Sequence, residues 1–154
     1  MKIITSFLVS LTCIQLYACN KNNEVTQQND LSEFLNTDTT KMTITIGNIV
    51  FTATLYNNAT AAAFKARLPL TINMTDLNGN EKYFDLPNAL PANAANPGSI
   101  QNGDFMLYGS NTLVLFYKAF STSYSYTRIG RIDNPSGLAT ALRSGSISVI
   151  FDVE

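Results

Sequence analysis

The chain has 154 residues, a formal net charge of -1 and a hydrophobic fraction of 45%. It contains nine phenylalanines and seven tyrosines but no histidine and no tryptophan. Without histidine, the Ser-His-Asp and Cys-His nucleophile pairs, imidazole acid–base chemistry and the usual histidine-containing zinc sites are excluded. The near-neutral charge gives no basic footprint for nucleic acid, so we expect no nucleic-acid partner.

The N-terminus has the three parts of a signal peptide. Met1 and Lys2 give a charged start, an apolar run covers residues 3–11, and Leu16-Tyr17-Ala18-Cys19 follows. The apolar run is well short of the roughly 18 to 20 residues that a membrane-spanning helix needs. A buried core helix is the alternative, but a polar, low-complexity segment follows at once. We therefore predict a signal peptide at residues 1–18.

The sequence Leu16-Tyr17-Ala18-Cys19 resembles the lipobox of bacterial lipoproteins. The resemblance implies cleavage before Cys19, a diacylglycerol thioether on its sulfur, and acylation, for example with palmitate, of its new amino group. Two or more acyl chains hold a protein stably at a membrane, whereas a single chain holds it only marginally. We thus expect the lipid anchor to attach the protein to a membrane, at the periplasmic or outer face of a Gram-negative envelope.

The two cysteines have different expected fates. Cys13 would leave with the signal peptide, so the mature chain could form no internal disulfide. A plain free thiol at Cys19, or a secreted protein cut nearby, is the alternative to lipid attachment.

Residues 19–40 are expected to form the lipidated N-terminus and a flexible polar tether. Runs such as Asn20-Lys21-Asn22-Asn23-Glu24 cannot bury enough apolar surface to offset the entropy lost on ordering. A single helical turn is the alternative, because Asp30 and Glu33 form a capping-box pattern ahead of Phe34 and Leu35.

Residues 41–154 change to short runs rich in Thr, Ile, Val, Tyr and Phe, separated by Asn and Gly. This pattern is typical of strands joined by tight turns, and Asn78-Gly79 is a strong hairpin signal. The pattern predicts eight strands, at residues 42–46, 49–56, 70–75, 81–86, 104–108, 112–118, 127–132 and 146–153.

Two short helices interrupt the strands. Asn58 is a good N-cap for a helix that Pro69 ends, and Asn134 with Pro135 starts a second helix that stops before Gly145. Eight strands with helices at these points indicate a mainly β fold, a closed eight-stranded barrel capped at its ends. Residues 87–103, which hold three of the five prolines, are expected to be either a functional loop or a covering segment.

The order of these elements resembles the cyclophilin barrel. The resemblance rests on the hairpin and helix at residues 42–68, the Gly-Asp strand at 103–108 with the apolar strand at 113–117, and Ile129-Gly130-Arg131-Ile132 with the helix at 135–142. It implies a closed barrel and, in principle, prolyl cis/trans isomerase activity. The chain lacks the family's Phe-His-Arg strand and its tryptophan, and Tyr126 stands where the family has histidine. We therefore expect no catalytic residues, since a fold does not carry an activity without its site.

Tyr108, Phe116 and Tyr126 are the candidate binding residues, in a groove for a small ligand or peptide whose identity the sequence does not specify. An aromatic wall around a pocket would have this composition, and so would ordinary core and rim aromatics. The alternatives to noncatalytic binding are an isomerase with an atypical site, and a structural or interaction module that docks by an exposed strand.

Other patterns give no metal or cofactor site. The spacing of Asp76, Asn78 and Asn80 resembles the start of a calcium loop, but no glutamate follows at the twelfth place, so we expect a solvated hairpin. The glycines lack phosphate-binding spacing, and we expect no cofactor. Arg128 and Arg131 are expected on opposite faces of one strand, so that at most one faces the groove.

Overall fold

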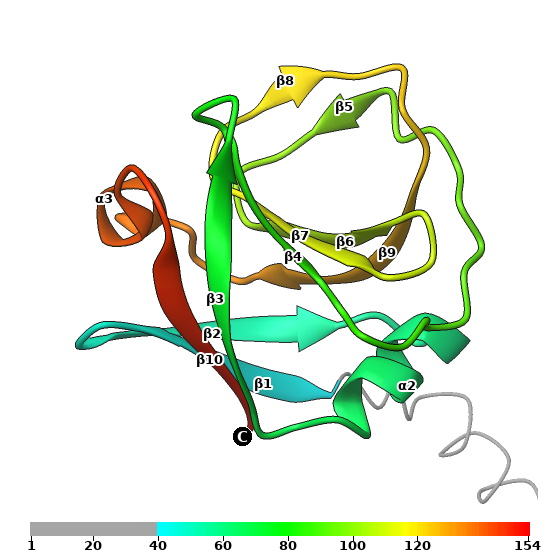
Figure 1. Ribbon diagram of the computed structural model, residues 1–154, viewed down its shortest axis with the longest axis horizontal. Coiled ribbons are helices and arrows are strands. Elements are labelled where there is room, and N and C mark those ends of the chain that lie inside the picture. The colour runs from blue at the N-terminus through cyan, green and yellow to red at the C-terminus, as the bar shows by residue number, and fades with distance from the viewer. Residues whose placement is uncertain (1–39) are drawn as a thin grey trace, which may run out of the picture. The chain divides into compact units, whose positions relative to one another are not determined.

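The computed structural model describes residues 40–154 (Figure 1). The predicted signal peptide, the lipid attachment at Cys19 and the tether up to residue 39, with its alternative helical turn, lie outside the described residues. Within residues 40–154, no helix is long and apolar enough to cross a membrane.

The described residues form a closed barrel of eight strands in the order β1-β10-β3-β4-β7-β6-β9-β2, with every neighbouring pair antiparallel. The predicted mainly β fold and its eight-stranded barrel are thus confirmed. The barrel strands are β1 (Lys41–Ile46), β2 (Ile49–Leu55), β3 (Leu70–Leu77), β4 (Glu81–Asp85), β6 (Asp104–Tyr108), β7 (Thr112–Phe116), β9 (Tyr126–Ile132) and β10 (Ile147–Val153).

Alternation along the strands builds the core inside the barrel. Phe105 and Leu107 of β6 point inward and are fully buried, as are Leu113 and Leu115 of β7. Because successive side chains of a strand point to opposite faces, the residues between them lie on the outside of the barrel wall. This alternation decides which side chains can reach a surface site.

The helix α2 (Ala59–Lys65) closes one end of the barrel with an aromatic side chain. Asn58 caps it as predicted, its side-chain oxygen accepting a hydrogen bond of 2.8 Å from the Ala61 amide. Phe64 is fully buried and packs edge-on against Phe105 and Phe151, with ring centroids 5.0 and 5.6 Å away. The apolar face of α2 therefore completes the barrel core.

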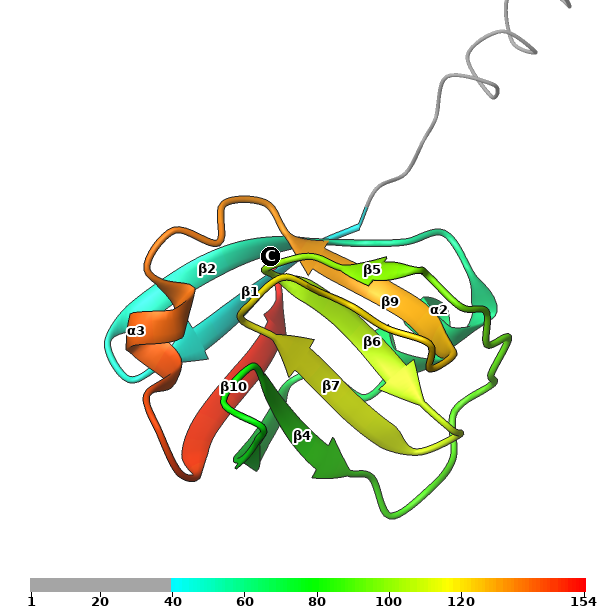
Figure 2. The same cartoon turned by 90° about the horizontal axis from the view of Figure 1, so that it is seen from above.

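The helix α3 (Leu138–Leu142) lies at the other end of the barrel (Figures 1 and 2). Its start differs from the sequence prediction, because Gly137 rather than Asn134 is the N-cap residue. The Asn134 side chain instead accepts a hydrogen bond from the Ser136 amide, and the Pro135 carbonyl accepts one from the Leu138 amide. The capping signals are thus used by a turn that precedes the helix.

Two further strands, which alternation did not predict, form a ribbon outside the barrel. The strands β5 (Ser99–Ile100) and β8 (Phe120–Ser121) pair with each other and lie over the outer face of β6, β7 and β9 (Figures 1 and 2). Beneath them lies a second apolar cluster, separate from the barrel core, made of Ile100, Met106, Val114, Phe116 and Tyr126. Residues 87–103 therefore include a covering segment.

A β-bulge in β9 overturns the expectation for its two arginines. Phe105 pairs with Gly130 and Met106 with Arg128, so Ile129 has no partner on β6. The extra residue shifts the alternation by one place, a usual effect of a bulge. Arg128 and Arg131, opposite Met106 and Asp104, consequently both lie on the outer face, and both are exposed.

Candidate functional site

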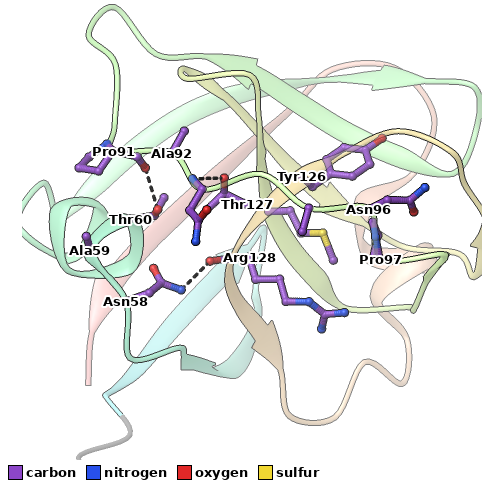
Figure 3. Close-up of a pocket in the computed structure, with 13 residues that line it drawn as sticks. Asn58, Ala59, Thr60, Pro91, Ala92, Asn96, Pro97, Tyr126, Thr127 and Arg128 are labelled. Atoms are coloured by element: carbon purple, nitrogen blue, oxygen red, sulfur yellow. Dashed lines mark hydrogen bonds between the residues drawn. The ribbon is translucent and has the colours of Figure 1, made fainter.

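Two cavities open on the outer face of the barrel, and Tyr126 lines both. The larger one, of about 500 Å³, lies between the start of α2, the start of β9 and residues 91–97 of the covering segment (Figure 3). We call it the strap cavity. Arg128 is the one charged residue of its lining.

Hydrogen bonds hold the covering segment in place across the strap cavity (Figure 3). The Thr60 hydroxyl donates to the Pro91 carbonyl at 2.7 Å, and the Asn93 amide donates to the Thr127 hydroxyl at 2.9 Å. Ala95 and Tyr126 exchange both of their backbone hydrogen bonds at 3.0 Å. The polar groups along this wall therefore serve to fix the segment to the barrel.

The second cavity, of about 350 Å³, is aromatic and acidic. We call it the tyrosine cavity, because four of its nine lining residues are tyrosines. Tyr108 and Tyr124 are 45% and 62% exposed, far more than is usual for aromatic side chains that pack in a core. The lining consists of Leu77, Glu81, Tyr83, Asp85, Tyr108, Thr112, Val114, Tyr124 and Tyr126.

The three aromatic residues singled out from the sequence lie together, at different depths. Tyr108 and Tyr126 both line the tyrosine cavity, and their ring centroids are 5.6 Å apart. Phe116 is fully buried beneath the ribbon, 5.4 Å from the Tyr126 ring and 5.7 Å from the Phe120 ring. Phe116 therefore supports the wall of the cavity from below and does not line it.

Glu81 is the unusual residue of the tyrosine cavity. The whole residue is only 8% exposed, and its carboxylate makes no hydrogen bond or ion pair with any residue among 40–154, but the carboxylate oxygens themselves reach solvent in the cavity. Burial raises the pKa of this carboxyl above its ordinary value. Burial also raises the pKa of Tyr126, and the nearby charge of Glu81 adds to that shift. A partly buried acid that opens into a cavity and has a raised pKa is often found at a functional site.

Asp85 supplies the second carboxylate of the cavity. It is exposed and accepts a hydrogen bond of 2.6 Å from the Thr112 hydroxyl. Among residues 40–154, no group of three or more acidic or cysteine side chains is placed to hold a metal ion.

Lys82, the neighbour of Glu81, points into the barrel and belongs to a separate structural network. It is fully buried, and its Nζ donates to Asp76 Oδ2 at 2.7 Å and to the carbonyls of Arg143 and Gly145 at 2.8 and 2.6 Å. The Tyr117 hydroxyl donates to the same Asp76 oxygen at 2.7 Å. Lys82 thus joins the β3–β4 hairpin to the end of α3, and Asp76 accepts hydrogen bonds from both the Lys82 ammonium and the Tyr117 hydroxyl.

The same bonds account for the pKa values of the network. Hydrogen bonds from Lys82 and Tyr117 lower the pKa of Asp76, while burial and the bond to Asp76 raise the pKa of Tyr117 to about 12. The hairpin that resembles a calcium loop therefore uses its aspartate for internal contacts.

Sequence reasoning missed Glu81, Tyr83 and Asp85 as a set. They are alternate residues of β4 and pair with Phe116, Val114 and Thr112 of β7, which places all three on the outer face. The sequence shows that these three residues alternate along one strand. It does not show that this strand pairs with β7, which lies far along the chain.

The chain is thus a closed antiparallel barrel with one helix at each end and cavities on its outer wall. Residues 44–152 match the model of the cyclophilin-like family. The chain therefore belongs to the cyclophilin-like family.

One solved structure agrees with this assignment. The solution structure of a hypothetical protein from Archaeoglobus fulgidus is 19% identical, with a TM-score of 0.51 over 75% of this chain and 95% of that chain. At this identity the likeness shows the fold alone. No curated protein matches the chain.

Proposed function

We propose that the protein is an acylated envelope lipoprotein whose cyclophilin-like barrel binds a small ligand or peptide in the tyrosine cavity without catalysing a reaction. The observation that carries the binding proposal is the exposure of Tyr108 and Tyr124 around a cavity that also holds a buried acid. Exposed aromatic rings that converge on a concave site, beside a few polar groups, are typical of ligand sites.

The absence of catalysis is proposed from the composition of the site. The whole chain has no histidine, and among residues 40–154 no arginine lines the tyrosine cavity. Arg67 is bound to the carbonyls of Asn88 and Ala89, and Arg128 lines the strap cavity. A prolyl isomerase of the usual cyclophilin kind needs the arginine that this wall lacks.

A fragment screen tests the binding proposal. We expect some members of a library of small aromatic and charged compounds to shift the backbone NMR signals of the tyrosine cavity, and Tyr124→Ala to weaken that binding about tenfold, since a stacked aromatic contact contributes about 1 kcal/mol or more. Tyr56→Ala is the matched control, because Tyr56 is also exposed but does not line this cavity. Equal weakening by both variants, or no binder at all, would argue against the site.

The anchor is tested by its cysteines. We expect Cys19→Ser to abolish labelling with radioactive palmitate, because the sulfur that forms the thioether and the cleavage that frees the amino group would both be lost. Cys13→Ser serves as the control and should keep the label. If the Cys19→Ser protein still carries label, the lipoprotein proposal fails.

A further inference from the structure

All the charged residues that line the tyrosine cavity are acidic. Its charged lining residues are Glu81 and Asp85, both carboxylates, and within residues 40–154 no lysine or arginine lines it. Asp85 is exposed and bonded to Thr112, whereas Glu81 is 8% exposed as a residue and has no donor among residues 40–154, with its carboxylate oxygens open to solvent in the cavity. A partly buried carboxylate that no protein group binds is free to accept a charged hydrogen bond from a ligand.

Four tyrosines line the same cavity as the two acids. Tyr108 lies edge-on to Tyr124, with ring centroids 6.1 Å apart, and its ring lies 5.6 Å from that of Tyr126. Tyr83 completes the set on β4, two residues from Glu81. The face of an aromatic ring carries negative electrostatic potential and attracts a cation within about 6 Å of its centroid. Rings and carboxylates therefore favour the same sign of charge.

We propose that the ligand of the tyrosine cavity is a small organic cation, a protonated amine with an apolar substituent. This inference rests on the proposed function of the cavity as a binding site. The ammonium N–H groups would donate to the Glu81 carboxylate, to which no other group within residues 40–154 donates, and the tyrosine rings would surround the charge. Leu77 and Val114 provide an apolar wall for the substituent. A cavity of about 350 Å³ lies at the small end of the range for ligand pockets and suits a compact molecule.

Three compounds of similar size separate charge from shape, namely benzylammonium, benzyl alcohol and benzoate. Each is titrated into the full-length protein purified in detergent, and backbone NMR shifts of the tyrosine cavity report binding. We expect benzylammonium to bind at least about tenfold more tightly than benzyl alcohol, and benzoate to give no shift, because a charged hydrogen bond is worth about 1.5 kcal/mol or more.

Glu81→Gln keeps the shape of the side chain and removes its charge. We expect this variant to lose about tenfold in affinity for benzylammonium and to bind benzyl alcohol unchanged. Asp152→Asn is the matched control, because it removes one negative charge from β10, outside the cavity, and should change neither affinity.

The outcomes separate two proposals, that the tyrosine cavity binds a ligand and that this ligand is a cation. If benzyl alcohol or benzoate binds as tightly as benzylammonium, or if Glu81→Gln keeps full affinity for benzylammonium, the cation proposal is overturned while the cavity remains a ligand site. If none of the three compounds shifts the cavity signals, the cation proposal also fails, and the fragment screen decides separately whether the cavity binds ligands.

Discussion

Glu81 and Lys82 are adjacent charged residues of β4 that differ in their hydrogen-bond partners. Lys82 faces the interior, where three oxygens accept hydrogen bonds from its ammonium group. Glu81 faces outward into the tyrosine cavity and finds no donor among residues 40–154. A fully satisfied buried charge is what a structural role requires, while a carboxylate that is partly buried, solvated and not bound by the protein is suited to binding a ligand.

The raised pKa of Glu81 predicts how the stability of the protein changes with pH. Its folded pKa is raised, so its contribution favours folding at low pH and is lost as the pH rises from the unfolded value through the folded value. At pH 7 we expect Glu81→Gln to raise the free energy of unfolding by no more than about 0.5 kcal/mol, because the carboxylate is only partly shielded from solvent. The gain should shrink at pH 4. Urea unfolding at both pH values measures it, and a loss of stability at pH 7 would mean that Glu81 has a stabilising partner.

Substitution of Lys82 should have the opposite effect and lower the free energy of unfolding. Lys82→Met leaves the Arg143 and Gly145 carbonyls without a donor and Asp76 without its ion pair, so we expect a loss of about 3 kcal/mol in the free energy of unfolding. Lys118→Met, at an exposed lysine, should change it by no more than about 0.5 kcal/mol. Similar small effects in both variants would contradict the structural role of Lys82.

The same network sets the acid limit of stability. The folded pKa of Asp76 is lowered, so its stabilising contribution is complete above the ordinary carboxyl pKa of about 3.9 and is lost as the pH falls through the lowered value. We therefore expect the stability of the natural protein to fall with acid in that range. Lys82→Met should flatten this dependence, since Lys82 is the largest cause of the shift.

At the scale of elements, α2 contributes Ala61 and Phe64 to the barrel core, and Phe64 is the larger of the two. Phe64 contacts Phe105 and Phe151, which themselves stack at 5.2 Å. We expect Phe64→Ala to cost about 4 kcal/mol, because it leaves a cavity at the end of a closed core. Tyr56→Ala, at an exposed aromatic residue nearby in the chain, should cost far less in the same unfolding experiment. A small effect of Phe64→Ala would show that the barrel does not depend on α2 for closure.

The elements that the sequence predicted are those whose signals are local. Strands such as 42–46 and 104–108 alternate or run apolar for five residues, and Asn58 caps α2 through its own side chain. The ribbon of β5 and β8 could not be predicted, because a strand of two residues has no periodicity and its partner is distant in the chain. The bulge at Ile129 shifted Arg128 to the outer face for the same reason, since only the pairing with β6 reveals it.

At the scale of the whole molecule, the order of elements was enough to indicate the closed barrel, because few folds place two helices at these points between eight strands. The site was predicted less fully. Tyr108 and Tyr126 line the tyrosine cavity, but Glu81 in sequence is one charged residue on a polar hairpin. The tyrosines that line the cavity with it come from β4, β6, β9 and the loop before β9, which only the closed barrel brings together.

The central claim is that this cyclophilin-like barrel binds a ligand at the tyrosine cavity and does not isomerise proline. The most direct measurement is NMR exchange spectroscopy of a proline-containing test peptide, whose uncatalysed cis/trans exchange takes tens of seconds or longer at 25 °C. We predict that the full-length protein leaves the exchange rate unchanged. Acceleration that is lost in Tyr108→Ala and kept in Tyr56→Ala would contradict the claim and identify the cavity as an isomerase site.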